Sequence, residues 1–224
     1  MFSSKDVKAI LKVSDCELMH LRTSNQISAI KKGNAFFYQL PVGKTALDHP
    51  VGGRLINWYK EVHEVELNNQ PKNSDSIDAL QALVVEILLP VYQKYPQLKV
   101  TYGFTSAELK TYISKHSPNG TAPSLDQHSS CELNKSQNQI CDRSGAACDF
   151  IVPNVPSNNL VRFIVANLNY DRIYYYGNEK PIHVSVSEKP LRHLQVMAES
   201  HKGRRYPSSK AFGDGAIDLA KELL

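Results

Sequence analysis

The sequence has few cysteines and no long apolar run. Its 224 residues include four cysteines, too few for a disulfide scaffold in a chain of this length. The most apolar stretch, residues 79–91, contains Glu86 and Pro90 and is shorter than the roughly 20 residues that a membrane-spanning helix needs. The N-terminus also lacks an apolar leader followed by a small-residue cleavage site. We therefore expect a cytoplasmic protein with reduced cysteines and no membrane contact.

Charge is distributed unevenly along the chain. The formal net charge of +4 does not by itself indicate a nucleic-acid-binding protein. Residues 1–44, however, carry seven Lys or Arg against three Asp or Glu, so the rest of the chain is about neutral. The content of 42% hydrophobic and 21% charged residues is typical of a globular protein that buries a core. The N-terminal part is therefore the one expected to meet an acidic partner.

The first forty residues predict two short helices followed by a hairpin. Serines at residues 3–4 can cap a helix whose apolar residues have helical spacing, and Ser14 can cap the next helix. Residues 27–30 and 35–38 read as short strands around a Gly-Asn turn. Helix, turn, helix and basic hairpin together form the outline of a winged helix-turn-helix.

In the order SSKDVKAILKVS, DCELMHLRTSNQI and SAIKKGNAFFYQL, residues 1–41 resemble the DNA-binding domains of excisionases and MerR-type regulators. The resemblance implies that the second helix enters a major groove, with nucleic-acid contacts from Arg22, Lys31 and Lys32. A protein-interaction use of the same fold, or a structural lobe, is the alternative, because the second helix also carries two acidic residues. We expect this module to span residues 1–44 and a second domain to span residues 45–224.

The middle of the chain predicts regular elements in close succession. An amphipathic helix is expected around residues 55–62, and a strong helix over residues 75–95 follows a polar loop. Residues 98–102 read as a strand and residues 107–115 as another helix. The aromatic stretch at residues 170–176 predicts a strand beside the candidate site described next.

Three later segments carry residues suited to metal chemistry. They are SLDQH (residues 124–128), RSGAACDF (residues 143–150) and KPIHVSV (residues 180–186). Small residues and one acid precede an apolar strand in the second segment, and one imidazole lies among β-branched neighbours in the third. Two imidazoles and one carboxylate on such segments can hold zinc on one face and leave a position for water.

In that order, H, then GxAxD, then HxS, the segments resemble the Hedgehog/D-Ala-D-Ala carboxypeptidase superfamily of zinc peptidases, over about residues 75–186. The resemblance implies an α+β fold with an antiparallel sheet flanked by helices. It also implies Zn²⁺ held by His128, Asp149 and His183, and hydrolysis of a peptide or amide substrate. Glu179, four residues before His183, is the candidate general base.

The chain departs from the pattern of that superfamily in three respects. His128 precedes Asp149 by 21 positions instead of seven, which implies an inserted loop over residues 129–144. Asp142 stands at the usual spacing, so a site of Asp142, Asp149 and His183 is an alternative. Thr105 stands where many members have a substrate-binding arginine, and no acid occupies the standard position of the general base.

The cysteines allow a different metal site. His128 with Cys131, Cys141 and Cys148 would form a Cys₃His structural zinc site, although the last two cysteines are too far apart in sequence for a zinc knuckle. A Cys131–Cys141 disulfide would require an oxidising compartment.

These patterns together predict a zinc peptidase or amidase fused to a winged helix, as in a phage, a mobile element or a defence system. The alternative is a non-catalytic DNA-binding regulator or accessory subunit that uses the peptidase-like domain as a scaffold. The sequence does not indicate an oligomeric state.

Overall fold

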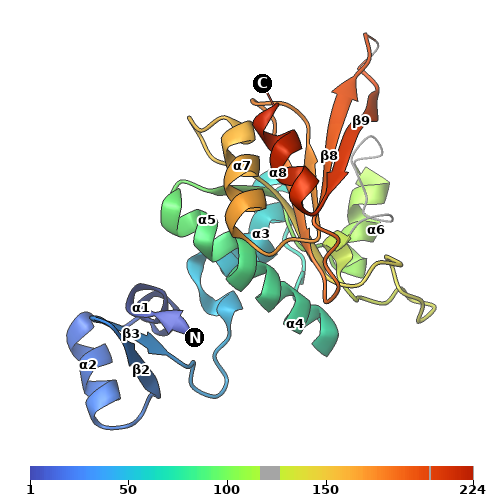
Figure 1. Ribbon diagram of the computed structural model, residues 1–224. Coiled ribbons are helices and arrows are strands. Elements are labelled where there is room, and N and C mark those ends of the chain that lie inside the picture. Colours follow the sequence, from blue (N-terminus) through green and yellow to red (C-terminus); the bar gives the residue numbers. More distant parts are fainter. Residues whose placement is uncertain (117–126, 202, 224) are drawn as a thin grey trace. The chain divides into compact units, whose positions relative to one another are not determined.

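The computed structural model describes residues 1–116, 127–201 and 203–223, and it is an α+β structure (Figure 1). The chain divides into two compact units, Met1–Gly53 and Arg54–Leu224. The division falls within α3 (Pro50–His63), nine residues beyond the expected boundary between residues 44 and 45. Residues 124–126 of the first metal-motif segment lie outside the described residues.

The helices of the first unit begin where the sequence places their caps. Ser3 and Asp6 form a capping box that starts α1 (Ser4–Leu11), and Ser14 and Glu17 form a second one that starts α2 (Asp15–Thr23). Each box satisfies backbone N–H groups that a helix leaves without partners in its first turn. The predictions of both helices are confirmed.

A small antiparallel sheet completes the first unit. Its strands β1 (Phe2–Ser3), β2 (Ala29–Lys32) and β3 (Ala35–Tyr38) lie in the order β1-β3-β2, and a short 3₁₀ helix, η1 (Ala46–Asp48), follows. The predicted hairpin around Gly33 is confirmed, and β1 is an additional strand. The core of this unit is built from side chains of both helices and the hairpin, namely Val7, Leu18, Ile27 and Tyr38.

The second unit combines a six-stranded sheet with helices. After α3 the chain forms one long helical segment, with α4 (Ser74–Leu83), the π-helical turn η2 (Val84–Leu88) and α5 (Leu89–Lys94). Pro90 has no N–H to donate, which accounts for the local widening into a π turn. The remaining elements are β4 (Lys99–Tyr102), α6 (Ala107–His116), η3 (Gln127–Ser129), β5 (Ala146–Ile151), α7 (Ser157–Asn167), β6 (Arg172–Tyr175), β7 (Ile182–Val186), β8 (His193–Glu199), β9 (Arg205–Phe212) and α8 (Asp214–Lys221).

The sheet is mixed, so the prediction of an antiparallel sheet is wrong for one strand pair. The strand order is β4-β5-β7-β6-β8-β9, and β6 pairs with β8 in parallel while the other pairs are antiparallel. The parallel pair arises because β6 lies between β7 and β8. The chain reverses direction from β6 to β7 and reverses again into β8, so β8 runs in the direction of β6.

The two faces of this sheet differ in character. One cross-strand row contains Cys148, Val184, Ile173, Leu194 and Ala211, and the first four of these side chains are buried. Helices α4, α7 and α8 pack against the strands, as Figure 1 shows. Residues on neighbouring positions of the same strands point to the opposite face, because strand side chains alternate. That opposite face carries the imidazoles and the carboxylate of the predicted site.

None of the helices within the described residues combines the length and the apolar character required to cross a bilayer.

Candidate metal centre

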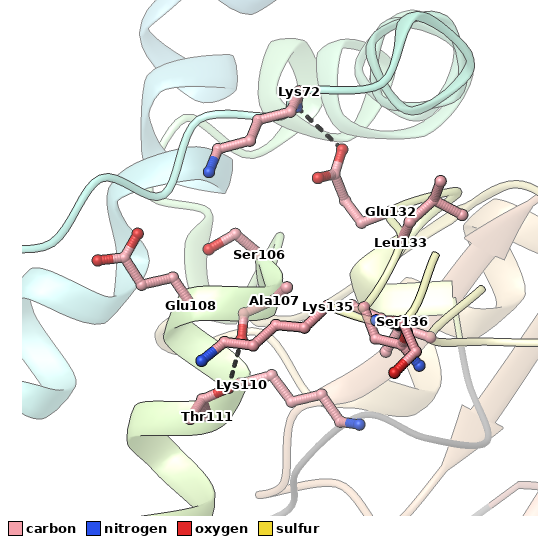
Figure 2. A pocket seen from close by; sticks show the side chains of 12 residues that line it. Lys72, Ser106, Ala107, Glu108, Lys110, Thr111, Glu132, Leu133, Lys135 and Ser136 are labelled. Atoms are coloured by element: carbon pink, nitrogen blue, oxygen red, sulfur yellow. Dashed lines mark hydrogen bonds between the residues drawn. The ribbon is translucent and has the colours of Figure 1, made fainter. Parts of the chain in front are cut away.

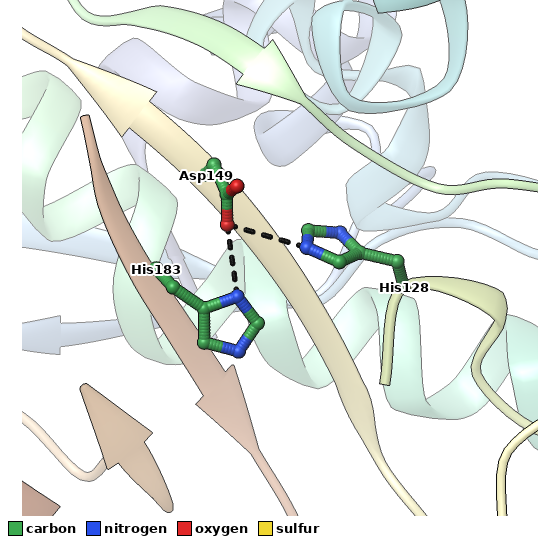
Figure 3. A group of neighbouring side chains, drawn as sticks. All are labelled: His128, Asp149 and His183. Carbon is green, nitrogen blue, oxygen red and sulfur yellow. Dashed lines mark hydrogen bonds and ion pairs between the residues drawn. The ribbon is translucent and has the colours of Figure 1, made fainter. Parts of the chain in front are cut away.

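The three predicted ligands come together on the polar face of the sheet. Asp149 lies on β5, His183 lies directly opposite it on β7, and His128 lies on η3, which precedes β5 in the chain. Figure 3 shows both imidazole rings turned toward the Asp149 carboxylate. One ligand atom from each residue lies within 4.8 Å of the other two, so the cluster could hold a metal ion.

The carboxylate of Asp149 is the centre of the cluster. Its Oδ1 lies 2.8 Å from Nδ1 of His183 and 3.2 Å from Nε2 of His128. Both histidine side chains are only 3% exposed, whereas that of Asp149 is 28% exposed. The cluster is therefore held in the interior and opens toward solvent at the carboxylate.

The ring of His128 is oriented by the backbone of the segment after β4. Its Nδ1 lies 3.2 Å from the carbonyl oxygen of Gly103, and a carbonyl only accepts, so Nδ1 carries the proton. The other nitrogen, Nε2, faces a carboxylate, which requires either a second proton or a cation there. A histidine that donates one ring N–H to a backbone carbonyl and presents the other nitrogen to a shared site is the usual arrangement of a metal ligand.

Two further hydrogen bonds fix η3 at this position. The N–H of Thr105 donates to the carbonyl of His128 at 3.0 Å, and the Ser129 hydroxyl donates to the carbonyl of Thr105 at 2.8 Å. Thr105 is fully buried, and its role in the structure is to hold His128. Gly103 is required at its position because a Cβ there would lie 2.2 Å from the Leu55 carbonyl oxygen.

His183 has one nitrogen engaged and one nitrogen without a partner. Nδ1 meets Asp149, whereas Nε2 is buried and has no hydrogen-bond partner among the described residues. The ring of Tyr174 stacks on that of His183, with centroids 4.8 Å apart and planes inclined by 15°. The stacked ring restricts rotation of the imidazole, and the hydroxyl of Tyr174 accepts a hydrogen bond from Arg143 at 3.2 Å.

The electrostatics of the cluster favour an ionised carboxylate. Burial raises the pKa of Asp149, but the charge and hydrogen bond of His128 and those of His183 outweigh it and hold the pKa well below the ordinary value. The acid is therefore ionised at neutral pH and can serve as an anionic metal ligand.

A cavity of about 200 Å³ opens at the cluster. Besides the three ligands, it is lined by Tyr102, Tyr176, Lys180, Pro181 and Arg205. Asp149 is the only carboxylate among these described lining residues. The two charged side chains among the other lining residues, Lys180 and Arg205, are both cationic.

The other predicted site residues are placed differently. Glu179 is exposed in the turn between β6 and β7 and does not line the cavity, although Lys180 and Pro181 beside it do. Asp142 is exposed and lies outside the metal-binding group. Within the described residues the cysteines add no ligand to that group, and none of the four cysteines forms a disulfide.

A larger cavity, of about 700 Å³, lies away from the metal cluster. Its lining comes from the start of α6, from Lys72, and from residues 132–136 and 140, and Figure 2 shows these side chains. It contains both lysines and glutamates, and Glu132 accepts hydrogen bonds from the N–H groups of Lys72 and Asn73. None of its described lining side chains is among the buried polar groups without a partner, so its size does not make it the better candidate site.

The predicted nucleic-acid contacts all lie in the first unit. Lys31 and Lys32 are exposed on β2 next to the hairpin turn, and the Arg22 guanidinium on α2 lies 3.7 Å from the centroid of the Phe36 ring. The stacked arginine occupies a defined position between the helix and the hairpin.

Several residues around the cluster were not predicted from the sequence. Gly103, Tyr174, Lys180 and Arg205 surround the ligands, and they come from four separate segments. Their one sequence signal is local, since Tyr174 belongs to the aromatic stretch and Arg205 to the basic cluster at residues 201–205. The prediction that the aromatic stretch forms a strand beside the site is confirmed by β6, which pairs with β7.

No family model, curated protein or solved structure matches this chain.

Proposed function

We propose that this protein is a zinc-dependent hydrolase of a peptide or amide bond, of the D-Ala-D-Ala carboxypeptidase type, joined to a winged helix that binds DNA or a partner protein. The observation that carries the proposal is the cluster of His128, Asp149 and His183, with its oriented imidazoles and its ionised acid. The resemblance in the order of the sequence motifs supports the same reading.

The donor set supports zinc as the ion. Two imidazole nitrogens and one carboxylate are the protein ligands of many catalytic zinc sites, which keep a further position open. Magnesium and calcium prefer sites made only of oxygen. The Nδ1 of His183 and the Nε2 of His128 both face the Asp149 carboxylate, at 2.8 Å and 3.2 Å, so these two nitrogens are the ones placed to bind the ion. Zinc, when bound, supplies Lewis acidity toward a water molecule and toward a carbonyl oxygen.

The side chains of the cavity can bind and orient the substrate. Lys180 and Arg205 carry positive charge where the attacked carbonyl oxygen would gain negative charge, and Tyr176 lies under the Arg205 guanidinium at 4.9 Å. Glu179 is the proposed acceptor of the proton from the attacking water, because it directly precedes the lining residues Lys180 and Pro181.

The test is hydrolysis of model peptides by the zinc-loaded protein. We expect release of an amine that requires zinc, and we expect Glu179→Gln to reduce kcat about 10²- to 10⁴-fold while the zinc content stays the same. The matched control is Glu188→Gln, which also replaces an exposed acid near β7. A Glu179→Gln variant with unchanged kcat would remove Glu179 from the mechanism. Zinc binding without hydrolysis of any peptide or amide substrate would remove the enzymatic proposal.

A non-catalytic role is the second candidate, and one observation favours it. The described lining of the cavity contains no carboxylate besides Asp149, so a general base is not in place next to the ligands. In that case the second unit would be a zinc-stabilised scaffold for a regulator. The two candidates differ in one result, since only the enzyme turns over substrate when zinc is bound.

For the first unit we expect duplex DNA binding that weakens steeply with salt. Replacing both Lys31 and Lys32 by Gln removes two phosphate contacts, which lowers affinity roughly fiftyfold at 0.1 M salt and reduces the salt slope by about two. Fluorescence anisotropy with labelled duplexes at several salt concentrations measures both. The control replaces Lys99 and Lys189, two exposed lysines of the second unit, by Gln. Equal loss in the two double variants would contradict DNA binding through the hairpin and favour a partner protein.

A further inference from the structure

The polar face of the six-stranded sheet continues beyond the metal cluster as two adjacent rows of side chains. The first row crosses the strands at Asp149, His183, Tyr174, Gln195 and Lys210. The second row lies two residues along the same strands and therefore on the same face, and its members are Ala147, Ser185, Arg172, His193 and Phe212. Residues that are paired across strands share a face and lie side by side, so the metal ligands and His193 belong to one continuous surface.

The ring of His193 has a defined protonation pattern. Its Nδ1 lies 3.4 Å from the guanidinium NH1 of Arg172, and a guanidinium only donates, so Nδ1 accepts. The proton of the neutral ring is therefore on Nε2. Phe212 stacks on the ring with centroids 4.5 Å apart, which fixes its plane.

The N–H of His193 is a buried donor without an acceptor. The residue is 8% exposed, and its Nε2 has no hydrogen-bond partner among the described residues. A buried donor left in this state costs free energy, whereas an acceptor placed beside it removes the cost. The unpartnered Nε2–H of His193 therefore indicates a ligand with an oxygen acceptor.

Three cationic side chains lie close enough to the His193 ring to act on its charge. Burial and the charges of Arg172, Lys210 and Arg143 lower the pKa of His193, and the carboxylate of Asp171 opposes them. Asp171 offsets the charge of Arg172, with which it pairs at 3.4 Å, and it also accepts hydrogen bonds from the N–H of Leu191 at 2.9 Å and from Gln127 at 3.1 Å. Lys210 and Arg143 are left without a carboxylate among these groups. The positive charges thus exceed the negative charge next to an unsatisfied donor.

We propose that His193, Arg172, Arg143 and Lys210 form a binding subsite for an oxyanion group, a phosphate or a carboxylate, beside the metal cluster. The Nε2–H of His193 would donate to one oxygen, and the guanidinium and ammonium groups would neutralise the charge. Tyr174 separates the two sites, since it stacks on His183, lies 6.4 Å from His193 between ring centroids, and accepts a hydrogen bond from Arg143.

The subsite also specifies a substrate class, and this step rests on the proposed function. A substrate whose scissile amide lies at the metal cluster would place an anionic group over β6 and β8, one side chain away. We therefore expect hydrolysis to favour peptides or amides that carry a phosphate or carboxylate near the cleaved bond over their neutral analogues. Binding of the anion itself does not depend on catalysis.

The test is titration of the zinc-free full-length protein with inorganic phosphate and, separately, with acetate. Histidine side-chain NMR reports the position, because the signal lost in His193→Gln identifies that ring. We expect at least one of the two anions to shift the His193 signal, and Arg172→Gln to weaken that binding about tenfold. Since Arg172 is partly buried and its replacement can disturb folding, Lys210→Gln, at an exposed position, is the second variant and is expected to weaken binding severalfold.

Lys180→Gln is the matched control, because this lysine lines the metal cavity instead of the subsite. We expect the control to leave anion affinity unchanged. Shifts confined to His128 and His183, or equal losses in Lys210→Gln and Lys180→Gln, would overturn the subsite and assign anion binding to the metal cavity. Zinc titration of the same samples keeps the two proposals distinct: normal zinc binding with no response of His193 to either anion overturns the subsite alone.

Discussion

Replacing His183 by Ala is expected to lower zinc affinity about 100- to 1,000-fold. The estimate follows from the free energy of zinc binding at four-ligand sites, of which one ligand accounts for about 3–4 kcal/mol. His183 is buried, and its Nδ1 lies 2.8 Å from the Asp149 carboxylate, so no other described side chain of the metal-binding group can take its place. Competition with a chelating dye measures the affinity, and elemental analysis of the purified protein measures the zinc content.

Two further variants make this experiment decisive. Asp149→Asn keeps the size of the side chain and removes its charge, so it tests the ligand set even if His183→Ala disturbs packing around Tyr174. His116→Ala is the matched control, because this histidine is exposed at the end of α6 and stacks on Tyr112. Zinc binding that survives in both ligand variants, or that falls equally in the control, would rule out the cluster as the zinc site.

Replacing Gly145 by Ala is expected to destabilise the protein by about 3–5 kcal/mol. Gly145 immediately precedes β5 and has a φ of +106°, which L-residues rarely adopt, and a Cβ there would lie 1.9 Å from the Val186 carbonyl oxygen. The contact is with backbone, so the strands must separate to relieve it. Urea denaturation followed by circular dichroism measures the loss, which is a large fraction of the stability of a typical domain.

Gly177→Ala separates the cost of the positive φ from the cost of the steric clash with backbone. Gly177 also has a positive φ, of +114°, but nothing lies within 4 Å of a Cβ built on it. We expect that variant to lose only the conformational part, about 1–2 kcal/mol. Similar losses at both positions would show that the close approach of β5 to β7 is not what makes Gly145 necessary. The close contact between Gly145 and the Val186 carbonyl matters for the site because it lies at the start of the β5–β7 ladder. The register of that ladder, which begins with the pair Ala146 and Val186, places Asp149 opposite His183.

Local sequence signals explain why the first unit was predicted well. The capping boxes of α1 and α2 and the turn at Gly33 use residues that are at most three positions apart. The helix α7 went unpredicted even though its apolar residues at positions 160, 161, 164 and 165 have helical spacing. The helical spacing of these apolar residues can be read from the sequence, whereas the order and pairing of the strands cannot.

The candidate site was predicted only in part, for a physical reason. The identities of His128, Asp149 and His183 follow from residue types and motif order. The neighbours of the ligands follow from cross-strand register, which sequence alone does not give. The parallel pairing of β6 with β8 places His193 beside Arg172, and these residues are 21 positions apart in the chain. Glu179 illustrates the reverse case, because its short sequence distance from His183 does not bring it into the cavity lining.

Hydrogen bonds hold η3 to Gly103 and Thr105. The position of His128 relative to Asp149 therefore does not depend only on the number of residues between them. His128 is anchored through hydrogen bonds to a segment that precedes it by more than twenty residues. Its neighbours Gln127 and Ser130 also donate hydrogen bonds to the carbonyls of Ser144 and Gly145, just before β5. The loop between these two attachments, residues 131–143, contains neither His128 nor Asp149, so its length does not fix the position of the imidazole. A site held in this way fixes the positions of its side chains in the fold and not their spacing in the sequence, so a sequence pattern with fixed intervals is unsuited to finding it.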